Sequence, residues 1–223
     1  TRARRVVLCT GGTDRPRKLG IPGEELPHVS HYFGDPHDYF RKKLLIVGGK
    51  NSAIEAALRC HHAGARVTLS YRGPQLPEPS IKYWLLPEIR GLTSSDRIKA
   101  YFSSRVTKIT PTSATIELSG GKTFDVDIDF VLVQIGFEQD KTIFHKAGVK
   151  LEGGPQCPVY DHATMMTSVP NLYVAGTAVG GTQEKFSVFI ENCHEHVTKI
   201  MKSMFGVDAQ TTCVTVAADQ EES

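Results

Sequence analysis

Two kinds of apolar pattern alternate along this chain. Continuous, mainly apolar runs at Leu44 to Val47 and Phe130 to Ile135 predict strands that are buried on both faces of a parallel sheet. Between these runs the pattern changes to period two, which is typical of antiparallel strands with one buried face. The alternating segments lie at 105–110, 113–118 and 123–129, with a hairpin turn at 119–121. The chain therefore combines a parallel α/β unit with an antiparallel meander.

The segment 43–73 predicts a complete strand, helix, strand unit. Helical periodicity runs from Ser52 to His62, with Asn51 or Ser52 available as the N-cap. Gly64 stands where a left-handed residue would end the helix. Arg66 to Ser70 then returns to strand character. About 30 residues is the expected length of such a unit.

Other elements follow from the remaining pattern. They are a strand at 4–10, a short helix at 81–89 that bends or ends at Pro87, a buried strand at 171–176 and a helix at about 183–204. The tail 208–223 has no clear period and is expected to be disordered. Tyr83 and Trp84 could stack on a nicotinamide or shape substrate entry, but aromatic residues in a short amphipathic helix are more often part of the core.

Composition excludes several classes of partner. Lys and Arg (26) exceed Asp and Glu (24) by two, which gives no strong field for nucleic acid or an anionic membrane. No apolar run approaches the roughly 20 residues that span a bilayer. The cysteines are scattered without a C-x-x-C pair, which favours a reduced, cytoplasmic setting and no catalytic redox centre among them. They are Cys9, Cys60, Cys157, Cys193 and Cys213.

Metal binding is not expected. Cys193 to His196 contains a Cys, a Glu and two His, but residues two apart on a helix face away from each other and cannot chelate together. His61 and His62 fail by the same geometry. A core Cys193 beside solvated histidines is the simpler interpretation.

The glycine-rich turn between the first buried strand and its helix carries the candidate chemistry. It reads Gly48, Gly49, Lys50, Asn51, Ser52, Ala53. A dinucleotide pyrophosphate can meet the unsatisfied N–H groups and the positive dipole end of a helix at such a turn. Lys50 replaces the second glycine of G-x-G-x-x-G, where its charge can meet a phosphate. The alternative is a tight turn that serves packing alone.

The end of the second strand indicates the cofactor. An NAD site requires Asp or Glu about 20 residues after the first glycine, whereas Thr68 to Gly73 contains no acid and includes Tyr71 and Arg72. A guanidinium there can pair with the 2′-phosphate of NADP. Taken alone, Arg72 could equally be a solvated charge at a strand end. Gly136, which closes the buried strand at 130–135, completes the expected residues of this site.

Two stretches resemble a known family. The runs Leu45 to Leu58 and Ala63 to Leu69 resemble the NADPH domain of thioredoxin-reductase-like flavoproteins. Ser80 to Ile89 is similar to the subgroup that contains bacillithiol-disulfide reductase, which lacks the C-x-x-C of thioredoxin reductase. The resemblance extends from Val6 to about Met204. It implies hydride transfer from NADPH to FAD and onward to a disulfide or related acceptor.

The resemblance also implies FAD contacts at two glycine turns. Thr10 and Gly11 follow the first strand, and Gly176 and Thr177 follow the strand at 171–176. The family's C-terminal helix points its positive end at the flavin, and Thr177 takes the place of an aspartate that binds the ribityl chain in many members. Loop geometry alone is the alternative interpretation of both turns.

The expected organisation is a doubly wound Rossmann-type α/β domain with a β-meander, flanked by partial FAD-domain segments. We expect an NADP-binding domain at 43–150, FAD-domain segments at 1–42 and 151–207, and the tail at 208–223. The expected partners are dinucleotide cofactors and a small disulfide or other redox acceptor, together with self-association through an exposed apolar face. A nucleotide-binding or regulatory protein without turnover is the alternative function.

The missing motif yields the first testable prediction. The family begins with a strand and a G-x-G-x-x-G turn for the ADP half of FAD, and no such motif precedes Val6. We therefore expect this chain, purified alone, to hold little or no FAD. Visible absorbance after gel filtration measures the flavin content, and a stoichiometric flavin spectrum would contradict the prediction.

Overall fold

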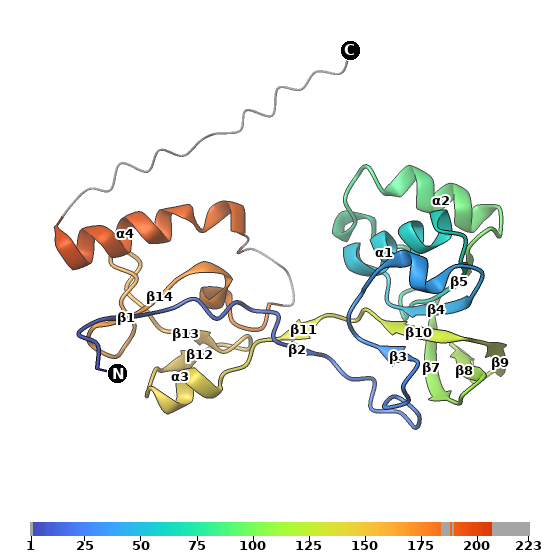
Figure 1. Ribbon diagram of the computed structural model, residues 1–223, viewed down its shortest axis with the longest axis horizontal. Coiled ribbons are helices and arrows are strands. Elements are labelled where there is room, and N and C mark those ends of the chain that lie inside the picture. Colours follow the sequence, from blue (N-terminus) through green and yellow to red (C-terminus); the bar gives the residue numbers. More distant parts are fainter. Residues whose placement is uncertain (1, 184–187, 189, 207–223) are drawn as a thin grey trace, which may run out of the picture. The chain divides into compact units, whose positions relative to one another are not determined.

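The computed structural model describes residues 2–183, 188 and 190–206, which form two compact units (Figure 1). Unit 1 combines the described residues up to Arg15 with those from Phe137 onward, and unit 2 is Pro16–Gly136. The chain passes between the units twice, at β2 (Arg15–Pro16) and just before β11 (Phe137–Glu138). Unit 2 is thus a single continuous segment of the chain.

A five-stranded parallel sheet forms the centre of unit 2. In spatial order its strands are β3 (Val29–Ser30), β10 (Phe130–Val133), β4 (Lys43–Val47), β5 (Arg66–Ser70) and β6 (Lys99–Tyr101). Leu44 and Ile46 of β4 pack into one buried cluster, while Leu45 and Val47 pack into another on the opposite face. Both faces are apolar because both are covered, as the continuous apolar run predicted.

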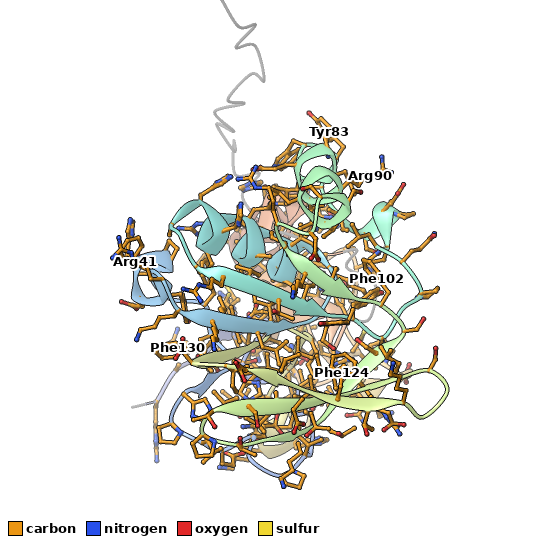
Figure 2. All side chains as sticks on the ribbon, turned by 90° about the vertical axis from the view of Figure 1, so that its right-hand side faces the viewer. Arg41, Tyr83, Arg90, Phe102, Phe124 and Phe130 are labelled. Atoms are coloured by element: carbon orange, nitrogen blue, oxygen red, sulfur yellow. The ribbon has the colours of Figure 1, made fainter. Side chains whose placement is uncertain are left out.

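Helices cover one face of this sheet, as Figure 2 shows. They are α1 (Asn51–His62) and α2 (Leu86–Ser94), with the short 3-10 helices η1 (Pro36–Tyr39) and η2 (Glu78–Ser80). The expected helix at 81–89 is wrong in its bounds. Pro87 lies in the first turn of α2, where its missing N–H costs nothing, and so it begins the helix and does not end it.

A three-stranded antiparallel meander covers the other face. It consists of β7 (Ser104–Ile109), β8 (Ser113–Leu118) and β9 (Thr123–Asp127). Val106 and Ile116 of the meander pack against Leu45 and Val131 of the sheet. The α/β class and the meander are confirmed. The strand order reverses between β4 and β10, as in a doubly wound sheet, but the meander takes the place of helices on the second face.

Unit 1 contains short strands around a separate core. β1 (Val6–Leu8) pairs in parallel with β14 (Leu172–Val174), and β12 (Leu151–Glu152) pairs with β13 (Cys157–Pro158). Its helices are α3 (Thr142–Lys146), α4 (His194–Phe205) and the 3-10 helices η3 (Gly176–Gly180) and η4 (Ile190–Asn192). Leu8, Phe144 and Ile200 are buried together, so segments from both ends of the chain build one core.

The expected domain limits at 43 and 150 differ from the limits of unit 2. β3 joins the segment before Lys43 to the sheet through its pairing with β10. Phe144 of α3 is buried in the core of unit 1. Pairing and burial therefore set the limits, which the ends of the apolar runs did not reveal. The assignment of each expected domain to a cofactor stays a prediction.

The C-terminal helix is shorter than expected. We predicted a helix from about Gln183 to Met204, but Gln183 is not helical and α4 begins at His194. Residues 184–187 and 189, and the tail predicted at 208–223, lie outside the described residues. Two apolar residues of the expected helix, Val197 and Met201, are exposed on α4. No helix in the described part of the chain has the length and apolar character to cross a membrane.

Two glycines give a matched test of the local backbone. Gly64 has φ +89 and a Cβ there would lie 3.0 Å from the Phe40 ring, whereas Gly91 in α2 has open space around it. We expect Gly64→Ala to destabilise the protein by about 1–2 kcal/mol, and Gly91→Ala to stabilise it by about 0.5–1 kcal/mol. Urea unfolding followed by circular dichroism measures both, and equal effects of the two substitutions would contradict the prediction.

Candidate functional site

The carboxyl ends of three neighbouring strands meet at one edge of the unit 2 sheet. The glycine turn follows β4, Tyr71 and Arg72 follow β5, and Gln134 to Gly136 follows β10. Val133 lies opposite Val47, and Val47 opposite Ser70, so the strands end at the same level. This edge is where open parallel sheets bind their ligands.

Gly48 is required by close approach on two sides. It has φ +143, and a Cβ at this position would overlap the carbonyl oxygen of Gln134. The same Cβ would lie 3.0 Å from the Cβ of Ala53, which is fully buried in α1. Gly48 and Ala53 therefore let β10 and α1 pack against the turn, as the motif's first and last positions do.

The Tyr71 ring lies against two glycines. A Cβ at Gly49 or at Gly73 would come within 2.5 Å of the ring atoms. The missing side chain of Gly49 thus makes room for Tyr71, a contact that the motif itself does not predict. A cavity of about 280 Å³ adjoins the ring and is lined by the loop from Gly73 to Pro79. An aromatic ring and a proline-rich wall offer a planar heterocycle surfaces on which to stack.

The N-terminus of α1 has no side-chain cap within the described chain. Its N-cap residue is Lys50, and the Oδ1 atom of Asn51 instead accepts a hydrogen bond from the backbone N–H of Lys82 at 2.7 Å. The expectation that Asn51 or Ser52 caps the helix is therefore wrong, because Asn51 holds the loop before α2. The first-turn N–H groups of α1 are left for water or an anionic ligand.

Tyr83 and Trp84 are not core residues. Their exposed fractions are 79% and 58%, and their rings meet edge to face at 5.0 Å. Figure 2 shows Tyr83 on the outside of the helical layer. The core interpretation fails because both residues precede α2 and do not lie on its buried face, which Ile89 and Leu92 provide.

The two glycine turns of unit 1 lie side by side. The parallel pairing of β1 with β14 brings the residues after each strand together. A Cβ at Gly11 would lie 3.9 Å from the Oγ1 atom of Thr177, and one at Gly12 would lie 3.4 Å from its carbonyl oxygen. Thr10 and Gly11 thus adjoin Gly176 and Thr177, which are far apart in sequence.

Gln139 links these turns, and the sequence analysis missed it. Its Nε2 atom donates to the carbonyl oxygens of Gly11 at 2.9 Å and Ala178 at 2.8 Å. The Oε1 atom of Gln139 and the Oγ1 atom of Thr10 are buried without a hydrogen-bond partner in the described structure. Buried polar atoms of this kind fit a ligand that donates and accepts hydrogen bonds. The only signal in the sequence was a polar residue soon after Gly136.

His196 has a structural role that the sequence did not indicate. It is buried, and its Nδ1 atom accepts the backbone N–H of Gly176 at 3.2 Å. Burial lowers the pKa of His196, which keeps this nitrogen available as an acceptor. The expectation of a solvated histidine is wrong here, whereas the buried position of Cys193 is confirmed.

The described cysteines differ in exposure. Cys9 is exposed, whereas Cys60 is fully buried in α1, and burial raises its pKa to about 11. Burial also raises the pKa of Cys157. Cys213 lies outside the described residues. A raised pKa lowers the fraction of nucleophilic thiolate at neutral pH, so burial disfavours nucleophilic chemistry at Cys60 and Cys157; that none of the cysteines is a catalytic redox centre stays a prediction.

Comparison with known proteins identifies a family that this chain resembles in sequence. A sequence model described as pyridine nucleotide-disulphide oxidoreductase matches residues 1–176. The chain is 37% identical over 190 residues to bacilliredoxin reductase Bdr of Bacillus subtilis, covering 85% of this chain and 58% of that protein. It is 29% identical to a ferredoxin–NADP reductase of Ignicoccus hospitalis, covering 77% of this chain and 55% of that one. The chain thus spans less than two thirds of the length of these relatives.

Solved structures of similar fold include two reductases. The bacillithiol disulfide reductase Bdr from Staphylococcus aureus matches with a TM-score of 0.84 and 36% identity, over 91% of this chain and 62% of that one. Thioredoxin reductase from Lactococcus lactis matches with a TM-score of 0.69 and 20% identity, over 89% and 67%. The second likeness concerns the fold alone.

The contrast between Cys9 and Cys60 predicts selective alkylation. With a pKa of about 11, about one Cys60 thiol in a thousand is ionised at about pH 8. We expect iodoacetamide to label Cys9 in the native protein while Cys60 stays unmodified, and both to react in urea. Peptide mass spectrometry after timed labelling measures this. Equal native rates would contradict it, and Cys9→Ser identifies the labelled peptide.

Proposed function

Because this chain belongs to the pyridine nucleotide-disulphide oxidoreductases, we propose that unit 2 binds NADP(H) in preference to NAD(H). We further propose that unit 1 contributes contacts to FAD. The corresponding reaction is hydride transfer from NADPH to FAD and then to a disulfide or related acceptor. The observation that carries the proposal is the glycine turn with Tyr71 and Arg72 at the carboxyl edge of the parallel sheet.

The adenosine half of the cofactor is assigned to the end of β5. Arg72 is exposed there, and its guanidinium offers a planar fork of N–H donors to a 2′-phosphate. Thr68 to Gly73 contains no carboxylate that would favour the free 2′-hydroxyl of NAD. The cavity beside Tyr71 is suited to the adenine ring.

The pyrophosphate is assigned to the turn and to the start of α1. The backbone N–H groups at Asn51, Ser52 and Ala53 lie in the first turn of a helix without a side-chain cap, and the helix dipole is positive there. Lys50 is exposed at the N-cap position and adds a charge close to the phosphates. Gly136 lies three residues beyond the end of β10, has φ +100 and completes the edge.

FAD is assigned to the paired turns of unit 1. Thr10 and Gly11 on one turn, and Gly176 and Thr177 on the other, are the residues that would hold it. The buried, unpartnered atoms of Thr10 and Gln139 support a polar ligand such as the ribityl chain. When bound, FAD would accept hydride from NADPH and pass two electrons to the acceptor.

The acceptor class rests on the relatives. Those at 36% and 37% identity are named for the reduction of bacilliredoxin and of bacillithiol disulfide. We extend to this chain only the chemical class, a disulfide or a related acceptor.

Cofactor preference provides the test. We expect calorimetry to show NADP⁺ binding roughly 10–100-fold more tightly than NAD⁺, because hydrogen bonds to a charged group contribute about 1.5–3 kcal/mol. Arg72→Glu should abolish the preference, since a carboxylate repels the 2′-phosphate.

Arg97→Glu is the matched control. Arg97 is an exposed residue of unit 2 that contacts His61 near the C-terminal end of α1, away from the glycine turn. It makes the same change of charge and should keep the preference. Equal affinities of the unmodified chain for the two cofactors would overturn the proposal.

A further inference from the structure

Gln134 stands where the strand order of the unit 2 sheet reverses. From β4 the chain continues to β5 and β6 on one side, whereas β10 and β3 lie on the other side of β4. The boundary between β4 and β10 is therefore the reversal point, and ligands of open α/β sheets bind outside the strand ends at such a point. Gln134 is the first residue after β10.

The backbone of Gln134 contacts the glycine turn directly. Its N–H donates to the carbonyl oxygen of Val47 at 2.7 Å, and Val47 is the residue before Gly48. Its own carbonyl oxygen occupies the space that a Cβ at Gly48 would need. The side chain of Gln134 therefore starts beside the turn that we assign to the pyrophosphate.

The side chain of Gln134 is held in one orientation. Its Nε2 atom donates to the carbonyl oxygen of His31 at 2.9 Å. Because the partner is a carbonyl, the atom that faces it must be nitrogen and not oxygen. His31 follows β3, so the side chain runs along the sheet edge from β10 toward β3.

His31, whose carbonyl oxygen accepts the bond from Gln134, is itself held in place. The His31 side chain is buried, and its Nε2 atom lies 3.4 Å from an oxygen of the buried Glu24 carboxylate. Glu24 accepts the backbone N–H groups of Leu19 and Gly20, both at 2.7 Å. A carboxylate held by two backbone donors is a well-defined partner, and it keeps the segment that carries His31 in place.

An oriented amide offers specific chemistry to a ligand. A glutamine carries two N–H donors and one carbonyl acceptor, and the bond to His31 uses one donor. The side chain is only partly buried, and Oε1 is not among the buried atoms without a partner in the described structure. One donor and one acceptor thus remain on the amide at the reversal point.

We propose that Gln134 binds the nicotinamide ribose half of NADP(H) and sets its position. The inference rests on the proposed function, which assigns the adenosine half to the end of β5 and the pyrophosphate to the turn after β4. A dinucleotide that continues in the same direction reaches β10 next, since neighbouring strands lie about 4.8 Å apart. The nicotinamide carboxamide carries an N–H donor and a carbonyl acceptor, which complement the amide of Gln134.

Two probes separate the halves of the cofactor. NADP⁺ contains both halves, whereas adenosine 2′,5′-bisphosphate lacks the nicotinamide ribose. We expect Gln134→Met, which keeps the side-chain length without its hydrogen bonds, to weaken NADP⁺ binding about tenfold in calorimetry. The same variant should bind the bisphosphate as the unmodified chain does. Gln134→Asn, which is too short to keep the bond to His31, should show the same selective loss.

The controls distinguish the possible failures. Lys122→Met alters an exposed residue of the meander's turn and should change neither affinity, while Arg72→Glu should weaken both ligands. If the unmodified chain binds neither probe, the proposed function fails and this inference fails with it. If it binds both, and the Gln134 variants bind NADP⁺ unchanged or lose both ligands equally, only this inference is overturned. If Gln134→Met does not fold, Gln134→Asn decides alone.

Discussion

The close approach of β4, β10 and α1 at Gly48 is the constraint on which unit 2 depends. A side chain at this position would overlap the Gln134 carbonyl and crowd Ala53. The sheet could then not bring β10 beside β4, and α1 could not start where it does. The same small residue thus sets the packing of three elements and leaves their polar ends at one edge. The close packing at Gly48 and the access of a ligand to this edge therefore depend on the same residue.

Periodicity predicted the parts of the fold in which local sequence and tertiary burial agree. β4 is apolar at every position after Lys43, and the structure buries both of its faces. The meander alternates, and the buried positions follow the alternation through β8, whereas β7 shifts its register by one residue after Val106. α1 also lies close to its predicted bounds. In each case the pattern of burial along the element repeats with the period of its backbone.

The rest depended on contacts between distant segments. β3 has only two residues, too few for any period, and exists because β10 offers it a partner. Asn51 fits an N-cap by residue type, yet its side-chain oxygen accepts a hydrogen bond from the backbone of Lys82, 31 residues further along the chain. In the candidate site, the turn and Arg72 were readable from the motif. The contact of Tyr71 with Gly49 and the bonds of Gln134 and Gln139 were not, because nothing local specifies them.

The two ends of unit 2 are joined by a hydrogen bond, from the N–H of Arg17 to the carbonyl oxygen of Gly136 at 2.9 Å. A segment whose ends touch can be inserted into a host chain without separating the residues that flank it. The insertion costs the flanking chain little conformational entropy, because the folded segment itself holds its two ends together. Evolution can therefore replace such a unit by another dinucleotide-binding segment. The core of unit 1, which contains Leu8, Phe144 and Ile200, stays intact in such an exchange.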